Sequence, residues 1–212
     1  MATSSPSASR TIVAGQQPAW KWVDAVGRFL VRRRILLSAI VFVLVVGKNI
    51  ASGLRPHDLA NLADPFTVAG VVLVFGGLAL RSWAVGILRK DKELTTTGPY
   101  SLIRNPLYVG SFMMMFGFCA LLDNPRDLWL MLGPVALLYI VKVRQEERLL
   151  AVLFPEQWPD YSRRTPRFLP MSWKVNFASD WRASQWMRSR EYQALGASLV
   201  ALVAIKLWQT YG

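Results

Sequence analysis

Residues 66–88, with the sequence FTVAGVVLVFGGLALRSWAVGIL, form an apolar block that contains one charged residue, Arg81. A helix needs roughly 20 mostly apolar residues to cross a bilayer, and this block has that length. Similar blocks occupy residues 35–46, 107–122 and 128–143, with polar segments between them. The first of these extends to residue 50 if its helix tilts or Lys48 snorkels. Apolar residues gathered in long blocks, without alternation or a narrow stripe, indicate transmembrane helices. The sequence therefore predicts an all-α, polytopic membrane helix bundle.

Residues 194–208 form a last apolar block, whose length fits a fifth transmembrane helix but also a re-entrant or surface helix. The segment 171–193 interleaves tryptophans with arginines and lysines, which is typical of a helix in the headgroup layer. We therefore expect about five transmembrane helices. The chain divides into three regions: a disordered tail with an interfacial helix at 1–34, a membrane core at 35–170, and an interfacial helix followed by a membrane helix at 171–212.

The 25 Lys and Arg residues are distributed unevenly in this chain of net charge +12. If the N-terminus is inside, the segments 1–34, 89–106 and 142–193 place 20 of them on the inner side, and the outer loops hold only 3. This asymmetry predicts an inner (cytoplasmic) membrane protein with a cytoplasmic N-terminus. In a membrane protein such a positive charge indicates contact with anionic lipid headgroups, and we expect no nucleic-acid partner.

The polar loop before the third block ends in TTTGPYSLIRNPLYVG, residues 95–110. Gly98-Pro99 predicts a turn, and Pro106 is well placed in the first turn of the next helix. A helix start exposes N–H groups and a positive dipole end, which can hold an anionic group. The same pattern also fits a loop that merely enters the membrane, with Arg104 and Tyr108 as interface anchors.

A second motif, KVRQEERLL at residues 142–150, ends the fourth block. On a helix Glu146 and Glu147 point about 100° apart. Lys142 lies four residues before the first carboxylate and Arg144 three before the second, so ion pairs can keep both ionised. The alternative is a solvated ion-pair cluster that only ends a transmembrane helix.

Residues 154–170, FPEQWPDYSRRTPRFLP, follow this motif directly. Their prolines exclude one continuous helix, and their aromatic residues indicate a folded cap. The single histidine, His57, has no cysteine or second histidine near it, so we expect no metal site.

The two motifs and the cap together resemble the isoprenylcysteine carboxyl methyltransferase and phospholipid methyltransferase superfamily over about residues 66–170. That family has a loop of the form LxTxGPYxxxRHPxYxG, then a membrane helix, EExxL, and a Tyr before a basic stretch that ends in proline. The matching residues are Leu94, Thr96, Gly98, Pro99, Tyr100, Arg104, Pro106, Tyr108, Gly110, Glu146, Glu147, Leu150, Phe154, Tyr161 and Pro170. The family's usual His is Asn105 here, which forms hydrogen bonds but does not titrate. We infer that this position helps to bind cofactor and that proton transfer by an imidazole is not essential.

The resemblance implies S-adenosylmethionine as methyl donor, bound at the cytoplasmic face between the two motifs. It also implies a lipophilic acceptor, such as an isoprenylcysteine-type carboxylate, a phospholipid amine or a related lipid. By motif position, the cofactor-binding residues are Leu94, Thr95, Tyr100, Asn105, Pro106, Leu107, Tyr108 and Glu146. The implied catalytic residues are Arg104, Arg144 and Glu147, and the implied substrate-binding residues are Lys142 and Arg144.

Two other functions fit parts of the pattern. Membrane reductases of the steroid reductase families, which use NADPH, have a similar C-terminal half with the motif RHPNYxGE. Here Leu107 replaces that Asn, and Ser111 follows Gly110 in place of the Glu. The other alternative is a non-catalytic membrane protein whose basic surface binds lipid. Added S-adenosylmethionine would then leave its thermal stability unchanged.

Overall fold

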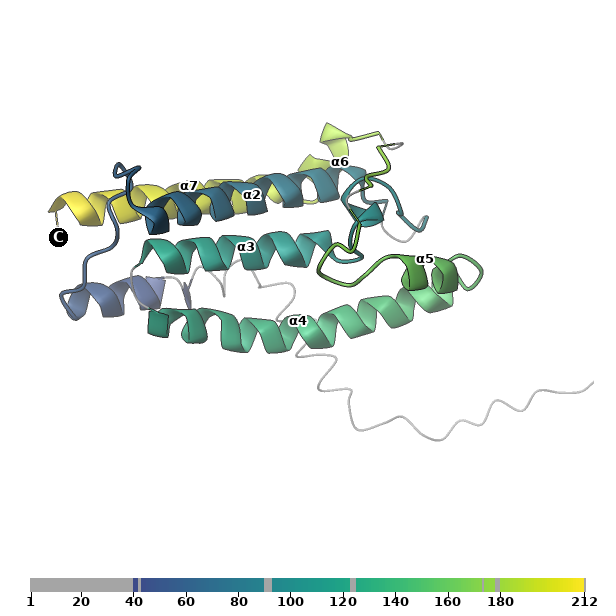
Figure 1. Cartoon of the computed structure of the whole chain (residues 1–212), viewed down its shortest axis with the longest axis horizontal. Coiled ribbons are helices and arrows are strands. Elements are labelled where there is room, and N and C mark those ends of the chain that lie inside the picture. Colours follow the sequence, from purple (N-terminus) through teal and green to yellow (C-terminus); the bar gives the residue numbers. More distant parts are fainter. Residues whose placement is uncertain are drawn as a thin grey trace, which may run out of the picture.

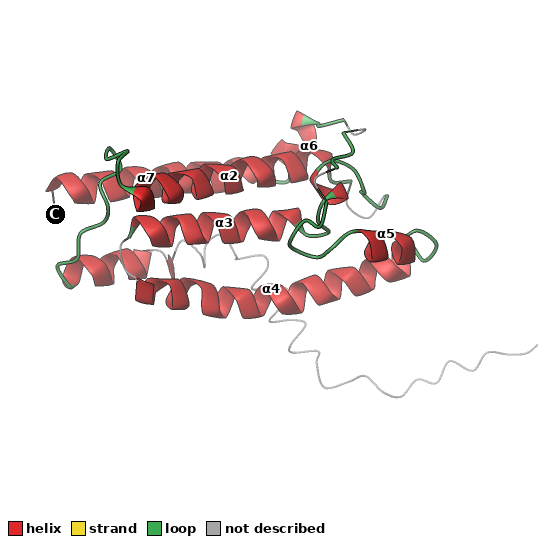
Figure 2. Cartoon of the chain, viewed as in Figure 1, coloured by secondary structure: helices red, strands yellow, loops and turns green. Residues whose placement is uncertain are grey.

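The computed structural model describes residues 40–41, 43–89, 93–122, 125–172, 174–177 and 180–211. These residues form helices and loops without a strand, which confirms the all-α prediction (Figure 2). The elements are a helical segment at 43–51, α2 (Pro65–Ile87), the 3-10 helix η1 (Pro99–Ser101), α3 (Pro106–Leu121), α4 (Pro125–Leu153), α5 (Trp158–Arg164), α6 (Ala183–Arg188) and α7 (Glu191–Tyr211). The predicted tail and interfacial helix at 1–34 lie outside the described residues.

The long helices lie side by side as a bundle. α3 lies between α2 and α4, and α7 runs beside α2 (Figure 1). The short elements η1, α5 and α6 gather at one end of the bundle, which we call the motif end. α3 begins at this end and α4 finishes there, so the two sequence motifs are brought to the same place.

Glycines allow α2 and α3 to pack closely. A Cβ added to Gly77 would lie 2.5 Å from the carbonyl oxygen of Gly110, and one added to Gly117 would lie 2.6 Å from that of Gly70. Small residues at such crossings let two backbones approach, which matters where lipid supplies no hydrophobic driving force. These contacts hold α2 and α3 against each other at two places along their length.

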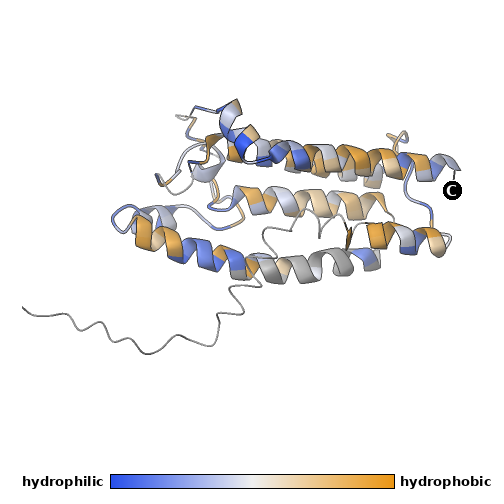
Figure 3. Ribbon diagram, turned by 180° about the vertical axis from the view of Figure 1, so that it is seen from behind, coloured by the Kyte–Doolittle hydropathy of each residue, from blue (hydrophilic) through white to orange (hydrophobic). Residues whose placement is uncertain are grey.

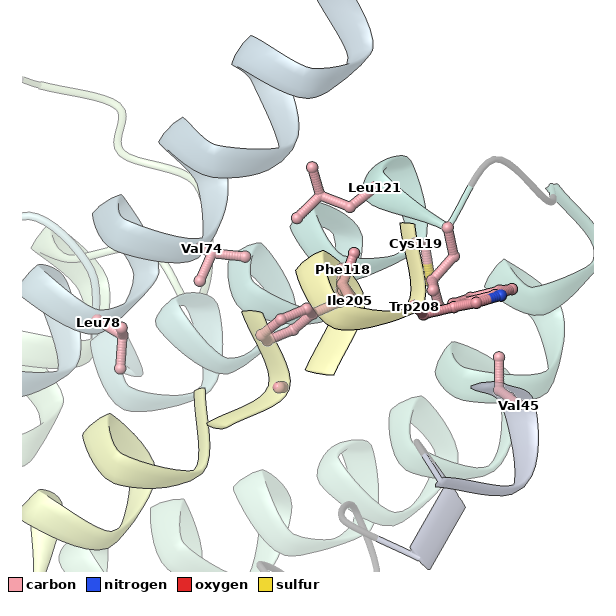
Figure 4. Packing of buried hydrophobic residues seen from close by; sticks show 10 residues of the cluster. Val45, Val74, Leu78, Phe118, Cys119, Leu121, Ile205 and Trp208 are labelled. Atoms are coloured by element: carbon pink, nitrogen blue, oxygen red, sulfur yellow. The ribbon is translucent and has the colours of Figure 1, made fainter. Parts of the chain in front are cut away.

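The apolar core lies toward the opposite end of the bundle. Side chains from α2, α3, α7 and the segment 43–51 meet there, as Figure 4 shows. Leu121 and Ile205 are completely buried, and Trp208 closes the cluster from α7. α7 is therefore packed into the bundle and is not a separate appendage.

Two helices in the described part of the chain, α2 with 23 residues and α7 with 21, are long and apolar enough to cross a membrane. α3 is apolar but shorter, so this test does not reach the expected five. α7 extends three residues beyond the apolar block 194–208 on each side, which brings its length to 21 residues. Its outward side chains Val200 and Val203 are 69% and 57% exposed, as expected for a helix that faces lipid. Figure 3 shows hydrophobic residues along the bundle and hydrophilic ones at the motif end.

Two predicted elements differ from the structure in extent. α4 begins at Pro125, three residues before the expected 128, because a first-turn proline and Asp127 both favour a helix start. The backbone remains helical through Pro134.

The interfacial helix expected at 171–193 is also much shorter, since only Ala183–Arg188 forms α6. The backbone before α6 forms hydrogen bonds with other parts of the chain instead. The carbonyl of Asn176 accepts from the N–H of Gly98 at 2.7 Å, and the N–H of Arg182 donates to the carbonyl of Gly86 at 2.9 Å. These contacts hold the segment on the motif loop and on the end of α2.

Candidate functional site

The turn at Gly98 begins the site. Gly98 has φ +58°, which glycine adopts without a steric penalty, and η1 follows at once. The Ser101 hydroxyl donates to the carbonyl of Gly98 at 2.6 Å and accepts from the N–H of Asn176 at 3.1 Å. The predicted turn is confirmed, and hydrogen bonds to Asn176 stabilise it.

The start of α3 is joined to the cap that follows α4. Pro106 is its first residue, as predicted. Just before Pro106, the backbone N–H of Arg104 donates a hydrogen bond to the backbone carbonyl of Pro166 at 2.8 Å. The side-chain amide of Asn105, which is buried, donates to the backbone carbonyl of Arg167 at 3.4 Å. These two hydrogen bonds hold the motif loop against the cap.

An ion cluster connects the two motifs directly. Glu147, only 8% exposed, lies 3.2 Å from a guanidinium nitrogen of Arg104 and 2.9 Å from one of Arg167. The hydrogen bond to Glu147 raises the pKa of Arg167. The expected Arg144–Glu147 pair is not formed among the described residues, because Glu147 turns toward the motif loop and leaves Arg144 exposed. The loop before α3 and the acidic pair of α4 thus meet.

The second carboxylate of the pair, Glu146, has a different environment. Its side chain is 35% exposed and lies 3.6 Å from the ammonium of Lys142, the partner expected from their spacing. The two carboxylates therefore diverge as the helical geometry requires. One is locked in an ion cluster, and the other remains accessible.

Two buried polar atoms near this cluster have no hydrogen-bond partner among the described residues: the hydroxyl of Tyr100 and Nε of Arg104. Burial raises the pKa of Tyr100, with further contributions from Tyr161 and Glu146, so its hydroxyl stays protonated and can donate. Tyr161 uses its own hydroxyl to donate to the carbonyl of Tyr100 at 2.9 Å. Buried polar groups are normally satisfied, so two unpaired ones together indicate a place for a ligand.

Aromatic rings border the same region. The rings of Tyr108 on α3 and Tyr139 on α4 lie 4.8 Å apart, and Phe112 meets Tyr139 edge-on at 5.4 Å. Trp158 lies under the guanidinium of Arg104 at 5.8 Å. Such ring faces attract cations, so the site combines aromatic walls with carboxylates.

The predicted cofactor residues fall into two places. A cavity of about 230 Å³ is lined by Ile87, Arg89, Glu93, Leu94, Thr95, Thr97 and Asp180. Leu94 and Thr95 are the predicted residues there, while Tyr100, Asn105, Tyr108 and Glu146 lie around the ion cluster and the start of α3. The ion cluster is the candidate site, because it joins both motifs and lies near the two unpaired buried atoms.

Three charged residues at the motif end were not predicted as part of the site. Arg167 belongs to the basic stretch of the cap, where nothing in its spacing singled it out. Arg81 was visible as the one charge in its apolar block, but its partner Glu191 lies 110 residues away in sequence. Only the fold brings these two together.

Comparisons with known proteins place these features in context. A family model described as phospholipid methyltransferase matches residues 65–157. The nickel-cobalt-cadmium resistance protein NccN of Alcaligenes xylosoxydans xylosoxydans is 34% identical over 156 residues, which are 73% of this chain and 72% of that protein. The cobalt-zinc-cadmium resistance protein CzcN of Cupriavidus metallidurans is 35% identical over 154 residues, 69% and 68% of the two chains.

A third relative is the protein-S-isoprenylcysteine O-methyltransferase of Xenopus laevis, 30% identical over 116 residues, which cover 49% of this chain and 40% of that enzyme. No solved structure matches. In the part of the chain that the structure describes, no three His, Cys, Asp or Glu side chains gather as they would around a metal ion.

Proposed function

Because the chain belongs to the phospholipid methyltransferase family, we propose that it transfers a methyl group from S-adenosylmethionine to a lipophilic acceptor at the cytoplasmic face of a membrane. The observation that carries the proposal is the ion cluster of Arg104, Glu147 and Arg167, which joins both motifs beside two unpaired buried polar atoms. The isoprenylcysteine methyltransferase relative supports the same class of reaction.

The side chains around the cluster fit this donor in charge and in hydrogen bonding. Bound S-adenosylmethionine would supply an electrophilic methyl group on a positively charged sulfur. Glu146, accessible and anionic, and the faces of Tyr108 and Tyr139 suit that charge. The Tyr100 hydroxyl and Arg104 Nε offer unused donors to its carboxylate or ribose oxygens. Leu94, Thr95, Asn105, Pro106 and Leu107 are proposed to complete the binding surface.

The cations of α4 suit the acceptor. Arg144 is exposed and Lys142 is partly exposed, so either can bind a carboxylate or a phosphate. Methyl transfer is an in-line displacement, and accurate placement of the two reactants supplies most of the rate. Glu147, held by two arginines, is proposed to orient Arg104 and not to act as a base. A carboxylate acceptor needs no base, whereas an amine must arrive neutral.

The reaction can be tested with S-adenosylmethionine labelled in its methyl group. We expect membranes that contain the chain to transfer label to a lipid-soluble product, and membranes with the Glu146→Ala variant to transfer none. Extraction into organic solvent followed by mass spectrometry identifies the acceptor. Label confined to water-soluble products would contradict a lipophilic acceptor. Binding of NADPH without S-adenosylmethionine would instead support the reductase alternative.

Cysteine labelling can test the proposed orientation, because the native Cys119 is only 7% exposed. Leu62 and Met171 are 80% and 87% exposed, and Met171 follows the cap at the motif end. We expect Leu62→Cys to react with an impermeant maleimide in right-side-out vesicles, and Met171→Cys to react only after detergent is added. The reverse pattern would show that the motif end faces outward.

A further inference from the structure

A buried ion pair ties the last long helix to the motif end. Arg81 on α2 and Glu191 in the first turn of α7 are 6% and 3% exposed. Their two hydrogen bonds, from Nε and Nη2 to the two carboxylate oxygens, measure 2.7 and 2.9 Å. Such a bidentate pair is geometrically specific. Glu191 lies outside the region that the family model matches, so the family motifs give it no role.

The same guanidinium also contacts the first two turns of α3. Its Nη1 donates to the Ser111 hydroxyl at 2.5 Å and lies 3.4 Å from the carbonyl oxygen of Leu107. A Cβ on Gly110 would lie 2.6 Å from Cγ of Arg81, so the glycine leaves room for the arginine stem. Arg81 therefore fixes the turn that begins at Pro106 and carries Tyr108.

The charge of Arg81 is unfavourable in this place unless it is compensated. A cation near a helix N-terminus opposes the helix dipole, and a buried cation without a partner is costly. It would also repel a positively charged methyl donor bound at the start of α3. The carboxylate of Glu191 neutralises the positive charge of Arg81.

We propose that Glu191 is a positioning residue for the methyl donor: it neutralises Arg81, so that the first turn of α3 is held in place without repelling a sulfonium. The inference rests on the proposed function. It predicts a difference between two ligands, S-adenosylmethionine and S-adenosylhomocysteine. The second lacks the methyl group and the positive charge but is otherwise the same molecule.

The test is to measure both affinities by calorimetry on the full-length chain in detergent. In Glu191→Gln, Arg81 remains charged and unpaired, so the affinity for S-adenosylmethionine should fall roughly tenfold more than that for S-adenosylhomocysteine. The double variant Arg81→Met/Glu191→Gln removes both charges and should restore the wild-type ratio. Arg81→Met alone leaves the carboxylate unpaired and should shift the ratio toward S-adenosylmethionine, which provides a test if Glu191→Gln does not fold.

Asp127→Asn is the matched control, because Asp127 is a buried carboxylate paired with Lys48 at the opposite end of the bundle. Its ratio should equal that of the wild type. An equal loss of both ligands in Glu191→Gln would mean a purely structural pair and would overturn the inference while the proposed function stands. A wild-type chain that binds neither ligand would overturn the proposed function, and this inference with it.

Discussion

Replacing Glu146 with alanine is expected to abolish S-adenosylmethionine binding and leave the fold intact. Two unit charges about 4 Å apart interact by about 4 kcal/mol at an effective dielectric constant of about 20. Glu146 is partly exposed, so solvent reduces this value, and we expect affinity to fall at least about a hundredfold. Calorimetry gives the affinity, and circular dichroism with size-exclusion chromatography reports the fold.

Glu156→Ala is the control for this variant. Glu156 is an exposed carboxylate in the loop after α4, so its removal changes the net charge by the same amount without touching the cluster. Its affinity should match that of the wild type. If Glu146→Ala binds as tightly as the wild type, Glu146 is not part of the donor site.

The turn in the motif loop and the start of the helix after it could be predicted from the sequence, because both depend on local chemistry. Gly98 can adopt a positive φ at no cost, and Pro106 suits the first turn of a helix, so the turn and the start of α3 followed from residue type. The Lys142–Glu146 pair followed in the same way from helical spacing. In each case the partners lie within a few residues of each other.

Partners that are distant in sequence could not be assigned. Spacing favoured Arg144 for Glu147, but the fold supplies Arg104 and Arg167, because the cap folds back over the motif loop. A bidentate pair in the tertiary structure outweighs a surface pair on one helix.

The prediction of an interfacial helix over 171–193 was wrong because of contacts with residues that are distant in sequence. Its composition is interfacial, but its backbone finds hydrogen-bond partners at Gly98 and Gly86, on the motif loop and on α2. The ring of Trp181 lies so close to Gly86 that a Cβ there would be 1.9 Å from the indole nitrogen. Tertiary contacts therefore replaced the helical hydrogen bonds that the composition favoured.

Replacing Glu147 with glutamine is expected to destabilise the whole motif end. The neutral amide leaves Arg104, whose side chain is 13% exposed, without its compensating charge. Breaking a buried ion pair from one side typically costs about 3–5 kcal/mol. Arg167 is 53% exposed and can turn to water, so we expect the lower part of that range. Thermal unfolding of the purified chain, followed by tryptophan fluorescence, measures the loss.

Substitutions at the two neighbouring carboxylates therefore distinguish a role in stability from a role in donor binding. Glu147→Gln should lower the melting temperature by several degrees and also weaken donor binding, because Arg104 loses its anchor. Glu146→Ala should abolish donor binding at an almost unchanged melting temperature, since its carboxylate is accessible and only loosely paired with Lys142. Glu156→Gln, at an exposed position, should change neither quantity. If Glu147→Gln unfolds at the wild-type temperature, the cluster does not hold the two motifs together, and the proposed site loses its scaffold.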